Sequence, residues 1–261
     1  MSLPTLGVIF RPQSPPEALR EIVEAVDATD VAELWLWEDC FSEGGIATAA
    51  AALAWSERVK VGIGLLPVPL RNPALAAMEL ATLERLAPGR VIAGLGHGVL
   101  DWMGQVGARA ESPLTLLREY TTAVRALLDG EKVDADGRYV KLDGVALDWA
   151  PQAPPELVLG ATREKTLRLA GELADGVLLV GDTDAEALRS ARAIVEEGRA
   201  ASGRDGLPRV ITYAEVDPAQ PDLRGVLRAR AEELAAAGAD AVAFHGTFDA
   251  PDPRPLLDAL A

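Results

Sequence analysis

The sequence predicts a (β/α)₈ barrel, the α/β fold in which eight strand–helix units close into a ring. Three observations predict it. Short apolar runs alternate with longer segments of helical period along the chain. Eight such units fit within 261 residues, a length typical of this barrel. The runs Val59–Leu66 and Arg90–Leu95 are apolar on both faces, as in a parallel sheet covered by helices. We therefore expect a single domain over residues 1–261, with short insertions at the carboxyl-terminal rim.

Eight apolar runs are expected to form the strands. They are Leu6–Phe10, Leu34–Trp37, Val59–Leu66, Arg90–Leu95, Glu156–Leu159, Val177–Val180, Arg209–Glu215 and Ala241–Phe244. Because helical segments separate them, right-handed crossovers predict a parallel sheet. A doubly wound sheet is the alternative. That fold usually places a glycine fingerprint just after its first strand, where this chain reads Phe-Arg-Pro-Gln-Ser-Pro-Pro.

The segments between these runs have the period of helices. They are Pro15–Ala28, Ile46–Ser56, Pro73–Leu86, Leu114–Leu128, Glu164–Ala174, Ala185–Ala200, Leu223–Ala237 and Pro255–Leu260. Two segments depart from the pattern. We expect His97–Ser112 to be a loop. Asp136–Trp149 alternates in period two around Gly144, which predicts a small hairpin outside the main sheet.

Composition restricts the class of protein. The net charge of −15 opposes binding to nucleic acid or anionic lipid. The most apolar run, Gly44–Trp55, is shorter than the roughly 20 residues that cross a bilayer. No basic segment followed by an apolar one opens the chain, so we expect a cytoplasmic protein. One cysteine excludes an internal disulfide and a multi-thiolate metal site, and no other metal-ligand spacing is present.

Two successive strands end in unusual backbone. Gly62, Gly64 and Pro67 mark the end of the third strand, and a glycine series, Gly94, Gly96 and Gly98, marks the end of the fourth. The carboxyl ends of barrel strands are where α/β barrels bind ligands. The sequence therefore predicts a ligand site at this rim.

Three segments in these places resemble the bacterial luciferase-like superfamily of flavin and deazaflavin oxidoreductases. The first is GIGLLPVPLRNPALAAMELATLERLAPGR, with its Arg-Asn-Pro turn and closing Gly-Arg. The second is Gly94-Leu95-Gly96-His97-Gly98, and the third is Leu173-Ala174-Asp175-Gly176-Val177. The resemblance covers residues 6–182 well and the last third weakly. The chain looks short for this superfamily, so trimmed insertions are expected at the barrel top.

The resemblance implies FMN or the deazaflavin coenzyme F420 as cofactor, and residues 37–41 favour F420. Asp39 and Phe41 match the deazaflavin branch, whereas Cys40 stands where that branch has histidine. The resemblance also implies a non-prolyl cis peptide at Gly64–Leu65, against the back of the ring. Val99 stands where sugar-phosphate dehydrogenases of this branch carry glutamate, which argues against a glucose-phosphate substrate.

Three residues are candidates for catalysis. Asp39 is expected to bond the ring or assist proton movement, or else to cap the following helix. Cys40 is expected to contact the ring. The alternatives are a small half-buried hydrophobe and a thiolate nucleophile, and the thiolate is disfavoured because Glu38 and Asp39 raise the pKa of the thiol. His97 is expected to bond the cofactor or shuttle a proton, or else to face water in a turn.

The remaining candidates bind the cofactor. The glycine series is expected to admit the cofactor to the backbone. Gly160-Ala161-Thr162-Arg163 opens a helix and is expected to cradle phosphate, with Thr162 as a plain N-cap in the alternative reading. Gly181 and Asp182 are expected to line the same pocket.

Other side chains on the rim have less specific expectations. We expect Arg71 to form a structural ion pair. Trp102 and Met103 are expected to cover the substrate side of the ring, or to pack on a neighbouring subunit. Trp35 and Trp37 are one strand period apart and are expected to lie in the core or to face a helix. His245 lies on the rim outside any motif.

These expectations define an oxidoreductase that transfers a hydride between F420 and a small organic substrate. Two alternatives stay open. One is an FMN-dependent monooxygenase, and the other is a catalytically silent cofactor-binding relative. The helix Ile46–Ser56 is nearly all small and apolar, which fits a homodimer contact as well as a monomer core.

Overall fold

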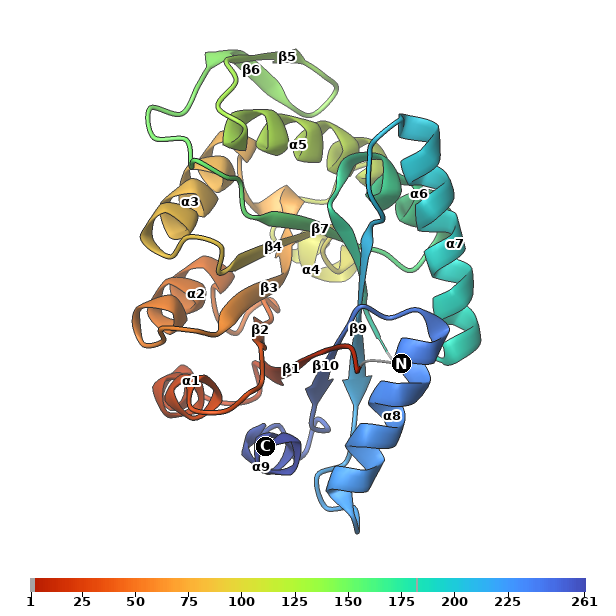
Figure 1. Ribbon diagram of the computed structural model, residues 1–261. Coiled ribbons are helices and arrows are strands. Elements are labelled where there is room, and N and C mark those ends of the chain that lie inside the picture. Colours follow the sequence, from red (N-terminus) through yellow and green to blue (C-terminus); the bar gives the residue numbers. More distant parts are fainter. Residues whose placement is uncertain (1–2, 182) are drawn as a thin grey trace.

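The computed structural model describes residues 3–181 and 183–261, and its central element is a closed barrel of eight parallel strands (Figure 1). Their order around the ring is β1-β10-β9-β8-β7-β4-β3-β2. The strands are β1 Thr5–Phe10, β2 Glu33–Leu36, β3 Lys60–Pro67, β4 Val91–Gly96, β7 Glu156–Gly160, β8 Gly176–Leu179, β9 Arg209–Glu215 and β10 Ala241–His245. The predicted (β/α)₈ barrel is confirmed.

Helices surround the barrel and join consecutive strands (Figure 1). They are α1 Leu19–Asp27, α2 Gly45–Ala54, α3 Pro73–Leu86, α4 Leu100–Gln105, α5 Pro113–Leu128, α6 Glu164–Leu173, α7 Ala185–Ser202, α8 Leu223–Ala237 and α9 Arg254–Leu260, with single 3₁₀ turns at Pro16–Ala18 and Val68–Leu70. None of the helices in the described part of the chain is both long and apolar enough to cross a membrane. The predicted homodimer stays a prediction.

Helix α4 corrects the expectation of a loop over His97–Ser112. The segment is rich in glycine, and Met103 is the one buried residue of α4. A Cβ atom at Gly98 would lie 2.9 Å from the Met103 sulfur. With a single buried side chain in α4, the segment has no apolar period that would reveal this short helix.

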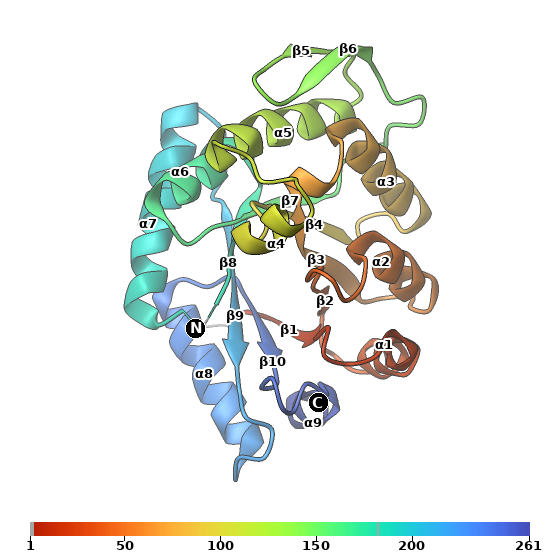
Figure 2. The same ribbon diagram turned by 180° about the vertical axis from the view of Figure 1, so that it is seen from behind.

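The hairpin lies outside the barrel, as predicted, but its turn is elsewhere. Strands β5 Val133–Asp136 and β6 Lys141–Val145 pair antiparallel beside α5 (Figures 1 and 2). Gly144 lies within β6 with φ +61° and is not the turn. The chain reverses after Asp136 because Glu119 of α5 accepts hydrogen bonds of 2.8–3.0 Å from three successive backbone N–H groups, residues 138–140.

The amino-terminal end of the barrel is filled by a buried charge cluster. Arg209, the first residue of β9, pairs with Glu33 and, at 3.0 Å, with Glu156. Glu33 also accepts a 3.0 Å hydrogen bond from the indole N–H of Trp35, which is fully buried inside the barrel as expected. Ligand access is therefore from the carboxyl-terminal mouth.

This cluster yields a prediction for stability. Arg209→Met leaves Glu33, whose side chain is 2 % exposed, without its cation. Breaking a buried pair in this way lowers the free energy of unfolding by about 3 kcal/mol. Urea denaturation measures the loss. The matched control is Arg168→Met, because Arg168 pairs with Glu164 and Glu197 on the exposed surface of α6 and α7 and should cost less than about 1 kcal/mol. Equal losses in the two variants would contradict a buried charge pair.

Candidate functional site

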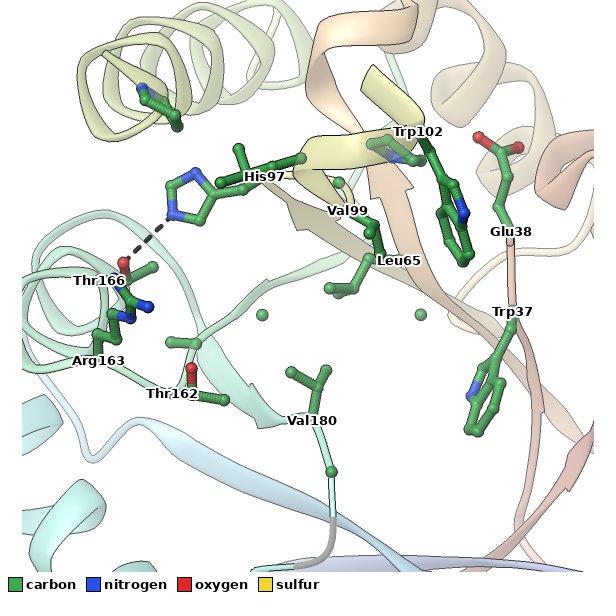
Figure 3. A pocket seen from close by; sticks show the side chains of 18 of the residues that line it. Trp37, Glu38, Leu65, His97, Val99, Trp102, Thr162, Arg163, Thr166 and Val180 are labelled. Carbon is green, nitrogen blue, oxygen red and sulfur yellow. Dashed lines mark hydrogen bonds between the residues drawn. The ribbon is translucent and has the colours of Figure 1, made fainter. Parts of the chain in front are cut away.

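A cavity of about 840 Å³ opens at the carboxyl-terminal mouth of the barrel (Figure 3). Its walls come from the ends of β2, β3, β7, β8 and β9, from the loop after β4 with α4, and from the starts of α5 and α6. Ten of the predicted site residues line it: Asp39, Gly64, Leu65, His97, Gly98, Gly160, Ala161, Thr162, Arg163 and Gly181. The expected rim site and this cavity therefore coincide.

Leu65 forms the floor of the cavity. The peptide bond Gly64–Leu65 is cis, as the family resemblance implies, and a second cis bond joins Cys40 to Phe41. Three glycines make room for the Leu65 side chain. A Cβ atom would lie 2.2 Å from a Leu65 methyl carbon at Gly160, 2.6 Å at Gly96 and 2.9 Å at Gly94. Gly94 and Gly96 thus lie behind Leu65 and do not line the cavity themselves.

Tyr213 supports the same floor from inside the barrel. Its hydroxyl donates a long hydrogen bond of 3.4 Å to the Gly64 carbonyl oxygen. A Cβ atom at Gly64 would lie 2.0 Å from that hydroxyl, so the contact requires glycine. Complete burial raises the pKa of Tyr213 well above its ordinary value, which keeps the hydroxyl protonated.

Asp39 and Trp37 form one wall. Burial raises the pKa of the Asp39 carboxyl, and the Arg11 guanidinium opposes this shift. Asp39 does not cap α2. The neighbouring Glu38 does so instead, by accepting a 2.6 Å hydrogen bond from the Gly45 N–H. Trp37 lines the cavity and is not a core residue, which corrects the expectation for it.

Glu38 is also the acid that holds Arg71. The Arg71 guanidinium binds Glu38 through two nitrogens, with a 2.7 Å bond from Nη2, and its Nε lies 3.4 Å from Glu79. The expected structural ion pair of Arg71 is confirmed. The Glu38 carboxylate therefore already accepts hydrogen bonds from the first N–H group of α2 and from Arg71.

The opposite wall is the beginning of α6. Thr162, Arg163 and Lys165 line the cavity there. The N-cap residue is Arg163, and no side chain caps the helix, so the reading of Thr162 as a plain N-cap is wrong. The first N–H groups of a helix lack partners within it. Together with two cations they form a site suited to an anion.

His97 lies between this wall and the loop after β4. Its Nε2 atom is 3.2 Å from the Thr166 hydroxyl oxygen (Figure 3). Burial lowers the pKa of His97, which favours the neutral ring. The side chain is half-buried and lines the cavity, so it is not a water-facing turn residue.

Cys40 is not among the residues that line the cavity. It lies in an adjoining pocket of about 380 Å³ with Phe41, Glu43 and Arg71. Burial, then Glu38 and Asp39, raise the pKa of the Cys40 thiol, which disfavours a thiolate. Asp182 falls outside the described residues. Within the described ranges no group of three or more His, Cys, Asp or Glu side chains is arranged to hold a metal ion.

Several lining residues were not predicted from the sequence. Tyr213 and Val180 face the barrel interior from β9 and from the end of β8, and Lys165 and Thr166 stand in the first turn of α6. The signal for Lys165 was its position two residues after the predicted phosphate cradle. Trp102 lines the cavity as expected, whereas Met103 is buried beneath Gly98.

The chain has relatives among known proteins. Residues 3–252 match the model of a family described as luciferase-like monooxygenase. A 5,10-methylenetetrahydromethanopterin reductase of Methanolobus tindarius is 30% identical over 175 residues, which are 67% of this chain and 53% of that protein. An F420-dependent glucose-6-phosphate dehydrogenase of Nocardia farcinica is 29% identical over 210 residues, 77% of this chain and 62% of that protein. The chain thus spans little more than half the length of these relatives.

Solved structures share the fold. The coenzyme F420-dependent tetrahydromethanopterin reductase of Methanopyrus kandleri superposes with a TM-score of 0.85 at 18% identity, covering 99% of this chain and 97% of that one. An F420-dependent secondary alcohol dehydrogenase, in complex with an F420–acetone adduct, also gives 0.85, at 20% identity with the same coverage. At these identities the likeness shows the fold alone.

The glycine niche around Leu65 yields a second prediction. Gly160→Ala places a methyl group against Leu65 and overpacks the floor, which should lower the free energy of unfolding by about 2 kcal/mol. Gly104→Ala is the matched control, because nothing lies within 4 Å of a Cβ there and alanine favours the helix. Chemical denaturation of both variants measures the difference. A Gly160→Ala variant as stable as the control would show that Leu65 is not confined.

Glu43 yields a third prediction, on pH. Burial raises the pKa of Glu43 from 4.5 to about 7, and its Oε2 atom is buried without a hydrogen-bond partner in the described chain. The folded state therefore binds the proton more tightly. This stability is fully present below pH 4.5 and is lost as pH rises through about 7. Glu43→Gln removes the loss, so its free energy of unfolding should rise relative to wild type across this window. Parallel stability curves for the two proteins would refute the assignment.

Proposed function

This chain belongs to the luciferase-like monooxygenase family, and on that premise we propose that it is a coenzyme F420-dependent oxidoreductase. The reaction is hydride transfer between the deazaflavin and a small organic substrate. The observation that carries the proposal is that one cavity combines Arg163 and Lys165 at the start of α6, where Glu164 also lines it, with the apolar Val99, Leu100 and Trp102 of α4 and the loop before it, and with Leu65 in its floor. Three of the relatives and solved structures described above carry F420 dependence in their names, which supports this cofactor over FMN.

The residues of the cavity fit such a cofactor. Leu65 and the glycines behind it give a flat, apolar floor on which a planar ring can rest. Arg163, Lys165 and the start of α6 would hold the anionic tail of the cofactor. The Trp37 side chain lines the cavity beside this floor.

When bound, the deazaflavin supplies the hydride acceptor or donor. The protein supplies position, exclusion of water and a proton site. Trp102 and Val99 cover the apolar end of the cavity, where they keep water from the reacting carbon. The Asp39 carboxylate takes the proton that leaves the substrate on oxidation, at one of its Oδ atoms. Its raised pKa brings this group closer to the working pH than an exposed aspartate.

The apolar end indicates a small uncharged substrate. Val99, Leu100, Trp102 and Leu114 line it. The lining cations among the described residues are Arg163 and Lys165, both at the start of α6. Figure 3 shows Arg163 on the side of the cavity away from Trp37 and Trp102. A sugar phosphate would leave its anion without a partner at this end, which costs free energy when water is excluded.

Titration of the purified protein with F420 and with FMN tests the proposal. We expect F420 to bind more tightly and to be reduced in the presence of an uncharged alcohol. Arg163→Met should weaken F420 binding roughly tenfold by removing a charge-assisted contact to the anionic tail. Arg168→Met, on the same helix but paired with Glu164 and Glu197, should leave the affinity unchanged.

The outcomes separate the alternatives. Tight FMN binding without F420 binding would overturn the proposal in favour of a flavin monooxygenase. Tight F420 binding with no turnover across a broad panel of alcohols, aldehydes and enones would favour a catalytically silent relative.

A further inference from the structure

Three side chains that the proposed reaction does not use meet behind Trp37. Arg11 follows the last residue of β1, whereas Glu215 and His245 are the last residues of β9 and β10. Because β10 pairs with both β1 and β9, the three strand ends are neighbours on the rim. Arg11 and His245 are each only 7 % exposed. A buried arginine at the rim of a barrel needs a physical explanation, since a charge is costly to remove from water.

The Arg11 guanidinium is held on several sides. Its Nη1 atom donates hydrogen bonds to the Gly246 carbonyl oxygen at 2.6 Å and to Glu215 Oε2 at 3.2 Å. The same atom lies 3.3 Å from His245 Nδ1, and Nε donates to Gln13 Oε1 at 2.9 Å. A planar guanidinium bonded in this way has a single orientation.

That orientation places the guanidinium against Trp37. The Arg11 Cζ atom is 5.2 Å from the centroid of the Trp37 ring, within the range of a cation–π contact. The His245 ring packs edge-on at 5.1 Å and 71°, and the Tyr213 ring lies 5.6 Å away. Trp37 lines the mouth cavity, but Arg11 and His245 do not. They therefore contact the indole from the side away from the cavity.

We propose that Arg11 is a positioning residue, which fixes the Trp37 indole in the cavity wall and places a permanent positive charge near Asp39. The inference rests on the proposed function only in taking this cavity as the reaction site. A second observation supports the role of the charge. The Arg11 guanidinium lowers the pKa of the Asp39 carboxyl against the effect of burial, so it favours the ionised form that can accept a proton.

The test uses the full chain without cofactor. Trp37→Phe first identifies the contribution of Trp37 to the near-ultraviolet circular dichroism spectrum. Arg11→Met, of similar length but without charge or plane, should lose most of that contribution. It should also shift the titration of the Asp39 carboxyl, followed by ¹³C NMR, to higher pH. Arg11→Lys should restore the Asp39 titration but not the full Trp37 signal, since an ammonium group lacks the planar fork.

Arg85→Met is the matched control. Arg85 lies 5.1 Å from the centroid of Trp149, a cation–π pair of nearly the same geometry on the exposed surface, where Trp149 is 73 % exposed. This variant should leave both readouts unchanged. If Arg11→Met does not fold, Glu215→Leu replaces it, because loss of this acceptor loosens Arg11 and should change the Trp37 signal in the same direction.

The proposal would be overturned if Arg11→Met left both the Trp37 signal and the Asp39 titration unchanged. Where the Glu215 variant is used in its place, an unchanged Trp37 signal would overturn it. Both measurements are made without cofactor, so they are independent of F420 binding. A protein that fails to bind F420 but shows the Arg11 effects would refute the proposed function and leave the positioning role intact.

Discussion

The confinement of Leu65 between three glycines is the constraint on which the mouth of the barrel depends. Gly94 and Gly96 in β4 and Gly160 in β7 leave no side chain where Leu65 lies, and Gly64 leaves room for the Tyr213 hydroxyl. The chain can therefore bend inward at the end of β3, where its pairing with β4 shifts register between Ile63 and Leu66. Side chains larger than hydrogen at these positions would push Leu65 into the cavity. Four glycines on three strands thus create one apolar floor, which explains why glycines gather at these strand ends.

The walls around this floor differ in chemistry because they come from different kinds of element. The start of α6 contributes unpaired backbone N–H groups and two cations, whereas α4 and the loop before it contribute Trp102, Val99 and Leu100. A ligand with an anionic tail and a planar head matches this order. The acids nearest the apolar end are not equivalent. Glu38 is committed to Arg71 and to the start of α2, so Asp39 is the carboxyl available for chemistry.

Alternation of apolar runs was sufficient to predict the barrel and its strands, because these depend on burial patterns that are local in sequence. The location of the site was predicted from the glycines at the strand ends and from the resemblance to the luciferase-like superfamily. The errors have a common cause in tertiary contacts. Trp35 and Trp37 lie on the same face of β2 and its extension, so the sequence cannot distinguish the one that is deep in the barrel from the one at its mouth. The hairpin turn is determined by Glu119, which is on another element. For Asp39, the alternative reading as a helix cap is excluded, because the first N–H group of α2 donates to Glu38, one residue earlier in an irregular loop.

Each end of the barrel holds an arginine with an acidic partner, and the two arginines differ in how they are paired. Arg209 at the amino-terminal end is half-buried and pairs with Glu33 and Glu156. Arg11 at the carboxyl-terminal end is buried, and its acidic ion-pair partner among the described residues is Glu215, whose side chain is 48 % exposed. Water screens that partner, so more of the Arg11 field reaches Trp37 and Asp39 than a fully paired arginine would provide. Paired charge at the base therefore stabilises the fold, and incompletely paired charge at the rim acts on the wall of the site.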